Sequence, residues 1–490
     1  MLYKKKHTTV MPKNQEIFLC ELDKLIKNFP YDNPTLSKKK KRKIIKLINS
    51  RYKLMADNDL TVLDEFISEK GNKYRFELRP IKVFKGILSG YKIKIGENNN
   101  NVSRYLEVAD LWLESKLHEI YFQGYIFDPS LKYKYKHAFN LYKGLAINPS
   151  QRDWSLLKEL MFENFCNKNQ YYYEWLLDWV YVLLKTPWEQ QYRAAIVLSG
   201  AQNTGKNTFA NFLRDILYPH YQATSDLKKA FKYNAFLENS LLVYLNEIKW
   251  ENNEYKGMLK SYISDDQILY EDKYKKVHLG DNYMRFIISS NDNWIINADP
   301  DDTRFFILKI DQKNKYANNQ NFFSRLYKQM YQDGGLEGFL HYILYEHKLK
   351  HSLHKIPKTK ALSQQIRRSL STFNLWLLEI AESGEIDKDI IITDNFKMQK
   401  DDLYEHYKIF CKNINKTPKS KGGWKIVMTE FIKKGGNCKL VRINNKEENG
   451  NFYVFSLKDL RKDIKKNFPS MIHDWEKPNN IEQLDELQKS

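Results

Sequence analysis

The middle of the chain alternates between short apolar runs and longer segments with helical periodicity. The apolar runs lie at 195–199, 241–245, 285–291 and 307–310. Short continuous apolar runs that alternate with helical segments are typical of a mainly parallel sheet covered by helices. Two apolar segments with helical spacing, 154–165 and 173–184, precede the first run. We therefore predict a multidomain α/β protein with a central domain at 151–345, in which a helical lead-in precedes the sheet.

The flanking regions differ from this centre. Region 1–150 has a basic helix carrying Lys38–Lys43, a strand-rich stretch at 74–95 and an amphipathic helix at 102–120, which predict a mixed α+β domain. The basic run by itself is typical of a solvated helix face. The alternative for this run is a contact with DNA, in which case the domain would be a collar that assembles subunits or grips DNA.

Region 346–490 opens with a basic connector and then shows helices at 402–414 and 425–433. Strands at 438–443 and 452–457 follow, joined by a turn at 444–450. This order predicts a winged-helix-like domain whose second helix enters the major groove, and origin binding becomes its expected role. Its expected DNA-contacting residues are Lys425, Lys433, Lys434 and Arg442. A small packing domain with solvated lysines is the alternative.

The net charge of the chain indicates which class of partner it binds. The chain has 490 residues and a net charge of +20, from 80 Lys and Arg against 60 Asp and Glu. Such an excess favours a polyanionic partner. No apolar run reaches the length of a spanning helix, so we expect DNA rather than a membrane. The four cysteines are far apart, which argues against a zinc site or a disulfide framework and favours a cytoplasmic location.

A phosphate-binding loop follows the first predicted strand. Residues 200–208 read GAQNTGKNT, and a helix is expected at 209–216. A strand, a GxxxxGK loop and a helix together let backbone N–H groups wrap a phosphate while the lysine reaches the β- and γ-phosphates. We therefore predict ATP as the ligand. Its expected contacts are Gly200, Asn203, Thr204, Gly205, Lys206, Asn207 and Thr208.

The metal ligands depart from the usual pattern. Asn207 stands where Ser or Thr commonly contacts Mg²⁺, and Thr208 follows one position later. The second predicted strand ends in Asn246 and Glu247, and a carboxylate at such a tip suits a general base that polarises water. We expect Mg²⁺ near these four residues, with Glu247 as the base; an ordinary polar strand end is the alternative.

Three further features complete the candidate machinery. Asn291 ends the third predicted strand and suits a γ-phosphate sensor. Arg304 is either an arginine finger acting on a neighbouring subunit or the partner of a local salt bridge with Asp301 or Asp302. Residues 268–279 alternate like a hairpin that would track the phosphates of one DNA strand, although a solvated hairpin is possible. The residues proposed for this contact are Lys273, Lys275, Lys276 and His278.

In kind, order and spacing these motifs resemble superfamily 3 helicases of the phage, plasmid and poxvirus-type primase-helicase group. The resemblance covers about 130–312 and rests on 139–149, 175–188, 200–208 and the block 246–306. It implies an AAA+ core, a hexameric ring with ATP between subunits, and translocation along single-stranded DNA. Size and composition are also similar to the replication helicases of staphylococcal pathogenicity islands.

The sequence therefore predicts an ATP-dependent DNA helicase and replication initiator that contacts single- and double-stranded DNA in a bacterial host cell, with host replication proteins as further partners. One alternative is a primase-helicase. Its polymerising site would need a carboxylate set, but the close pair Asp57 and Asp59 is followed by no supporting His or further Asp in a suitable strand pattern. The other is a DNA-binding AAA+ loader or remodeller that does not unwind.

Overall fold

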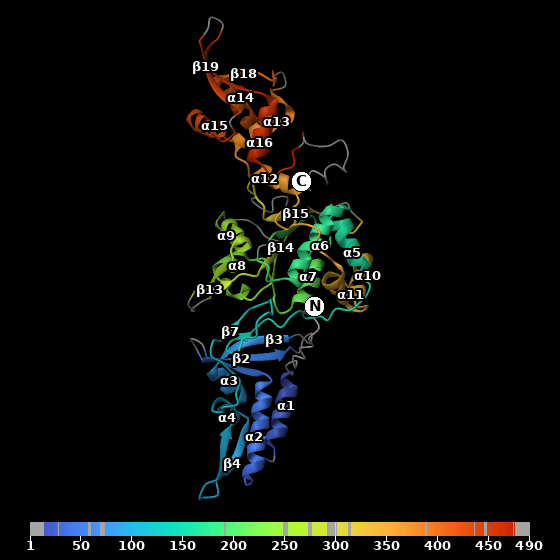
Figure 1. Cartoon of the computed structure of the whole chain (residues 1–490), viewed down its shortest axis with the longest axis vertical. Helices are drawn as coiled ribbons and strands as arrows, with labels where there is room; N and C mark the ends of the chain where they lie inside the picture. The colour runs from blue at the N-terminus through green and yellow to red at the C-terminus, as the bar shows by residue number, and fades with distance from the viewer. Residues whose placement is uncertain are drawn as a thin grey trace. The chain divides into compact units, whose positions relative to one another are not determined.

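The protein is described by a computed structural model, which divides the chain into two compact units. One comprises 1–148 with 213–221, and the other 149–212 with 222–490. Figure 1 shows their helices and strands. The structure describes residues 14–27, 29–56, 60–68, 74–190, 193–247, 253–272, 277–291, 299, 301–311, 315–387, 390–435, 437–444, 448–473 and 475.

The first unit packs helices against a small sheet. Its four-stranded sheet has the order β3-β2-β1-β6, and α1 and α2 lie side by side (Figure 1). Its core contains the fully buried aromatic residues Phe18, Tyr52, Phe84 and Trp112. The elements are α1 Gln15–Ile26, α2 Pro34–Asn49, β1 Tyr52–Ala56, β2 Leu60–Ile67, β3 Tyr74–Pro80, α3 Ile81–Leu88, β4 Lys92–Glu97, β5 Ser103–Glu107, α4 Val108–Leu113, β6 Ile120–Tyr121, β7 Tyr125–Ile126 and β8 Phe139–Asn140.

Two expectations for this unit were wrong in part. The stretch 74–95 contains the helix α3, because Ile81, Phe84 and Leu88 follow helical spacing and turn toward the core. The stretch 102–120 is not one helix. Its first residues form β5, which pairs antiparallel with β4, and only α4 remains helical. Pairing with β4 overrides the local helical pattern.

The second unit is built on a five-stranded sheet with the order β10-β11-β14-β9-β15. The registers of β11, β14, β9 and β15 are parallel, as the apolar runs predicted. The strands are β9 Ala195–Ser199, β10 Tyr221–Thr224, β11 Leu242–Asn246, β14 Arg285–Ser290 and β15 Phe305–Lys309. The surrounding helices are α5 Ser155–Glu159, η2 Leu160–Phe165, α6 Gln170–Lys185, α7 Lys206–Leu217, α8 Leu227–Lys232, η3 Asn234–Leu237, α9 Asn253–Ser264, α10 Gln320–Tyr331, α11 Gly335–His341 and η4 Tyr342–Glu346.

The C-terminal part of this unit combines helices with a three-stranded antiparallel sheet of order β18-β20-β19. The helices and strands expected at 402–457 are present, and Tyr407, Trp424 and Tyr453 are buried between them. The elements are α12 Lys360–Ser369, α13 Thr372–Ser383, β16 Glu385–Asp387, β17 Ile390–Ile391, β18 Phe396–Gln399, α14 Lys400–Asn413, α15 Lys421–Gly435, β19 Lys439–Asn444, β20 Asn449–Phe455 and α16 Leu457–Asn467. Within the described ranges, no helix has both the length and the apolar character needed to cross a bilayer.

A buried carboxylate fastens the connector after η4 to helix α6. Asp178 has no exposed surface, and its oxygens lie 2.7 Å from His347 Nε2 and 3.0 Å from His351 Nδ1. The backbone N–H groups of Lys350 and His351 also donate to it. A buried carboxylate needs such partners to offset its lost hydration.

We expect Asp178→Ala to lower the free energy of unfolding by about 3 kcal/mol, because the substitution leaves several buried donors without an acceptor. Urea unfolding of the full chain, followed by tryptophan fluorescence, measures the change. Glu174→Ala is the matched control. It removes the 2.6 Å pair with Lys350, whose side chain is half exposed, and should cost less than about 1 kcal/mol. Equal effects of the two substitutions would contradict the proposed importance of Asp178.

Candidate nucleotide site

The loop between β9 and α7 has a backbone that only glycine permits at two points. At Gly205, φ is +90°, and an added Cβ would lie 3.1 Å from the Phe323 ring and 3.2 Å from Leu160. At Gly200, an added Cβ would lie 2.7 Å from the carbonyl oxygen of Ile310. These contacts hold the loop close to its neighbours, and a side chain at either position would push it away.

The loop borders a cavity of about 320 Å³ at the carboxyl edge of the sheet. The parallel registers pair Ser199 with Ser290 and Asn246 with Ser289, so the three strands end at one level. The residues that follow these strand ends therefore meet in one place. The cavity is lined by Gln202, Asn203, Thr204, Gly205, Lys206, Asn207, Thr208, Glu247 and Asn291.

Three predicted residues form a hydrogen-bonded chain across this cavity. The Nζ of Lys206 donates to the carbonyl oxygens of Gly200 and Ala201, each at 2.6 Å, and to Asn291 Oδ1 at 3.0 Å. The Nδ2 of Asn291 donates to Glu247 Oε1 at 3.1 Å. Burial lowers the pKa of Lys206 to about 8, and the charge of Glu247 partly offsets this effect.

Glu247 has an unusual backbone. Its φ is +51°, in the left-handed region that non-glycine residues seldom occupy, and its N–H donates to the Ser289 carbonyl at 3.0 Å. Left-handed non-glycine residues concentrate at functional sites, where neighbouring contacts hold them in place. The backbone and the bond from Asn291 together aim an exposed carboxylate at the cavity.

Tyr244 connects the two asparagines that replace the usual metal ligands, and sequence reasoning missed it. Its hydroxyl donates to Asn207 Oδ1, and it lies 3.1 Å from Asn246 Oδ1 and 2.7 Å from Ser289 Oγ. Burial raises the pKa of Tyr244 to about 12, so the hydroxyl keeps its proton. The available signal was a tyrosine inside an otherwise apolar buried strand.

Asn207, Asn246 and Glu247, three of the residues expected near Mg²⁺, carry side-chain oxygen atoms on α7 and at the end of β11. Mg²⁺ binds to hard oxygen ligands and keeps several waters, so one carboxylate and amide oxygens, together with phosphates, are sufficient. Asn207, Asn246 and Glu247 carry such atoms. Within the described part of the chain, no group of three or more His, Cys, Asp or Glu side chains could hold a metal ion by itself.

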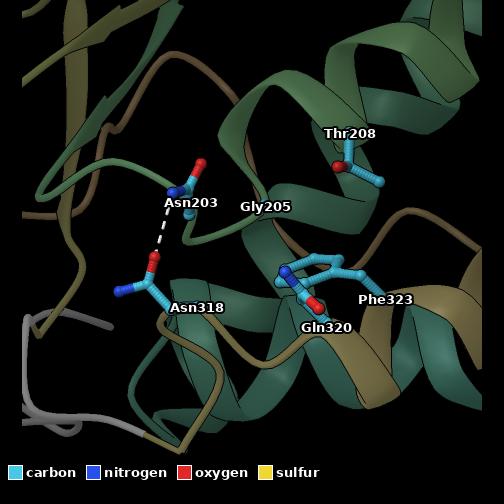
Figure 2. A pocket seen from close by; sticks show the side chains of 6 residues that line it. All are labelled: Asn203, Gly205, Thr208, Asn318, Gln320 and Phe323. Carbon is cyan, nitrogen blue, oxygen red and sulfur yellow. Dashed lines mark hydrogen bonds between the residues drawn. The ribbon is translucent and has the colours of Figure 1, made fainter.

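Thr208 faces a different neighbour from Asn207. Its hydroxyl lies 3.2 Å from the hydroxyl of Tyr327 on α10. It also lines a second cavity of about 320 Å³ with Asn203, Gly205, Asn318, Gln320 and Phe323, shown in Figure 2. The Nδ2 of Asn203 donates to Asn318 Oδ1 at 2.9 Å and joins the two sides of this cavity (Figure 2).

Asn164 on η2 supports the loop from beneath and was also missed. It is fully buried, and its Nδ2 donates to the carbonyl oxygen of Thr204 at 2.7 Å. Nothing in the sequence distinguishes this asparagine from others, because the contact joins residues far apart along the chain.

Arg304 forms the local salt bridge that was one of its two predicted interpretations. Its Nη1 lies 3.2 Å from Asp302 Oδ2, and its Nε donates to Ser264 Oγ at 3.2 Å. About a third of its side chain remains exposed. Its action on a neighbouring subunit stays a prediction.

The predicted hairpin is formed by β12 Gln267–Tyr270 and β13 His278–Asp281, which pair antiparallel. His278 is half exposed, and its Nε2 lies 3.0 Å from Glu238 Oε1. Lys273, Lys275 and Lys276 lie outside the described residues.

The candidate DNA contacts of the C-terminal part lie on α15 and β19. Lys425 and Lys433 are exposed on α15, and Arg442 is exposed on β19 opposite Asn451. Lys434 lies on α15, and its side chain is outside the described atoms.

Comparison with known proteins adds three findings. Residues 198–304 match a family described as "Family of unknown function (DUF5906)". Over 215 residues the chain is 24% identical to the DNA Primase-polymerase of Nitratiruptor phage NrS-1. That alignment covers 40% of this chain and 29% of the relative, so the chain spans less than a third of the curated relative's length.

Solved structures of the NrS-1 C-terminal region share the fold. One apo structure has a TM-score of 0.56 at 17% identity, covering 80% of this chain and 96% of that region. A second apo form has a TM-score of 0.57 at 16% identity, covering 84% and 98%. The chain is thus related to a phage replication protein, and its fold is that of the C-terminal region.

The lowered pKa of Lys206 predicts how nucleotide affinity changes with pH. With a pKa of about 8, this lysine loses its proton above about pH 8 unless bound phosphates favour its charged form. Affinity should therefore be nearly constant below about pH 8 and fall by up to about tenfold per unit above it. Titration with a non-hydrolysable ATP analogue from about pH 7 to about pH 9.5 tests this. A constant affinity over that range would contradict it.

Proposed function

We propose that the protein is an ATP-driven DNA helicase of the superfamily 3 type that acts in phage-like DNA replication. The observation that carries the proposal is the hydrogen-bonded chain from Lys206 through Asn291 to Glu247 across one cavity. A phosphate-binding lysine, a polar sensor and a carboxylate base are the groups that ATP hydrolysis requires.

The strand order supports the sensor role of Asn291. Because β14 lies between β9 and β11, the residue after β14 stands between the phosphate loop and Glu247. A γ-phosphate held by Lys206 would thus contact Asn291 on one side, with an attacking water between it and Glu247. The amide oxygens of Asn207 and Asn246 would complete the coordination of Mg²⁺, which neutralises developing phosphate charge. Thr208, which faces Tyr327, would contribute less to the metal.

The second cavity would take the nucleoside. It adjoins the loop through Asn203 and Gly205 and contains an aromatic ring, Phe323, and the amides of Asn318 and Gln320 (Figure 2). An aromatic ring can stack on a base, and amide groups can pair with its polar edge. The ligand would therefore extend from Phe323 to Glu247 along both sides of the loop.

Several observations support DNA as the substrate. The net charge is +20, and the related phage protein is named a DNA primase-polymerase. In the C-terminal part, α14 and α15 precede a hairpin of β19 and β20, the arrangement in which a winged helix places its second helix on duplex DNA. The hairpin of β12 and β13 would hold one strand in a hexameric ring, with Arg304 completing a neighbour's site.

The primase-helicase alternative draws support from the name of the phage relative. Asp57 and Asp59, the carboxylate pair considered from the sequence, lie outside the described residues. In the described part of the first unit, the adjacent carboxylates of β2 are held in ion pairs. Asp64 accepts from Arg51 and Arg79 at 2.7 and 2.8 Å. Glu65 lies 3.0 Å from Lys53 and accepts from Tyr74. Carboxylates held in ion pairs are poorly suited to bind the metal ions that nucleotide transfer requires. The pairing of Asp64 and Glu65 therefore favours the helicase over a polymerising role for this unit.

We expect Glu247→Gln to bind ATP and to lower its rate of hydrolysis about 10²- to 10⁴-fold, because the amide cannot polarise the attacking water. Lys206→Ala, by contrast, should lose nucleotide binding in addition to hydrolysis. Calorimetry measures binding, and phosphate release in the presence of single-stranded DNA measures hydrolysis. Glu271→Gln, which changes an exposed acid beside β12, is the matched control. Near-normal hydrolysis by Glu247→Gln would reject Glu247 as the base.

Strand displacement on a forked DNA duplex tests the helicase itself. The wild type should unwind with ATP and Mg²⁺. The double variant Lys275→Ala, Lys276→Ala should hydrolyse ATP yet separate strands at least about tenfold more slowly, because it loses phosphate contacts in the hairpin. The double variant Lys228→Ala, Lys232→Ala, in exposed lysines of α8, serves as the control. Hydrolysis by the wild type without strand separation would favour the loader or remodeller.

A further inference from the structure

An exposed strip of alternating lysines and aromatic residues lies in the first unit. It spans Lys132–His137 and reads Lys-Tyr-Lys-Tyr-Lys-His, in the loop between β7 and β8. All six residues are exposed. None of them belongs to the nucleotide site or to the DNA contacts considered above, so their chemistry is not yet accounted for.

The two tyrosine rings of this strip are available to a ligand. Tyr133 is 68% exposed and Tyr135 is 40% exposed. Their ring centroids lie 6.3 Å apart in an edge-to-face arrangement. The N–H of Gln123 donates to the His137 carbonyl at 2.8 Å, so the strip runs beside the turn that carries Phe122, itself 61% exposed. Several large rings exposed together are typical of a binding surface.

The loop that carries the strip has a defined shape at its base. The side chain of Asn140 bonds both the N–H and the carbonyl of Asp128, at 3.1 and 2.9 Å. Asp128 in turn accepts from the N–H of Ser130 and from the hydroxyl of Tyr135 at 3.0 Å. The exposed Leu131 adopts a left-handed φ of +53° at the turn. The strip is therefore presented from a fixed base, which lowers the cost of ordering it on a ligand.

We propose that Lys132–His137 is a binding strip for single-stranded DNA, in which the lysines contact phosphates and the tyrosine rings stack on unpaired bases. Lysines and aromatic rings side by side suit a single strand, which presents both its phosphates and the faces of its unpaired bases. A duplex offers the phosphates but covers the faces of its bases. The inference rests on the proposed function only for the choice of DNA as the polyanion.

The test measures binding by the full chain without nucleotide, using fluorescence anisotropy with a labelled thymidine oligonucleotide of about 20 residues. The double variant Tyr133→Ala, Tyr135→Ala should bind this strand about tenfold more weakly and should bind a duplex of equal length as the wild type does. The double variant Tyr133→Phe, Tyr135→Phe keeps the rings and should retain most of the affinity. Tyr105→Ala removes a tyrosine that is 57% exposed elsewhere in the unit and is the matched control.

The single variant Tyr133→Ala separates the loss of a ring from a loss of loop structure, because it keeps the hydrogen bond from Tyr135 to Asp128. It should still weaken single-strand binding severalfold. Replacing Lys132, Lys134 and Lys136 by Ala should weaken binding to both DNA forms and reduce its salt dependence.

The proposal is overturned if the Tyr→Ala variants bind the single strand as tightly as the wild type does. It is equally overturned if these variants lose as much affinity for the duplex as for the single strand. It is also overturned if the strip is needed for binding vesicles of phosphatidylserine and phosphatidylcholine but not for the oligonucleotide. Strand displacement is measured separately. A wild type that binds through these rings but does not unwind would refute the helicase and leave the strip supported.

Discussion

The parallel pairing of β9, β14 and β11 is the constraint on which the candidate site depends. Since neighbouring strands run in the same direction and end at one level, the residues that follow them meet at one edge. Lys206, Asn291 and Glu247 come from three distant parts of the sequence and are connected by hydrogen bonds there. A shift of one residue in either pairing would turn these side chains away from one another.

Lys206 and Glu247 are the charged side chains among the described residues that line the cavity. Asn207 and Asn246 stand at positions where a hydroxyl and an acidic residue, respectively, are commoner in ATPases with a phosphate-binding loop. Neutral amide oxygens attract a bare divalent ion less strongly than carboxylates do. The phosphates of a nucleotide would supply the missing negative charge. This balance favours entry of the metal together with the nucleotide, and Tyr244 holds the two amide oxygens in position until then.

The sequence predicted the sheet of the second unit well, because each buried strand is a short apolar run with a polar end. It also located the residues that line the cavity, since the phosphate-binding loop has a specific pattern. Prediction failed at β5, where pairing with β4 overrides a helical pattern, and at Asn164, whose role depends on a contact with a distant carbonyl. Tyr244 was missed because a tyrosine in a buried strand is ordinarily a core residue. The alternation of Lys and Tyr at 132–137 is visible in the sequence, but only the accessibility of Tyr133 and Tyr135 shows that their rings are exposed together.

The ammonium of Lys206 donates to the loop's own carbonyls and to Asn291, so groups of the protein satisfy its hydrogen bonds. In the proposed function, a nucleotide that binds would replace some of the hydrogen-bond acceptors of Lys206. Under the proposed function, Lys206 would exchange its bond to Asn291 for bonds to phosphate, and the Asn291 amide that also bonds Glu247 would be free to turn. In that proposal, nucleotide binding would reach Glu247 through the rotation of one side chain, without remodelling the sheet.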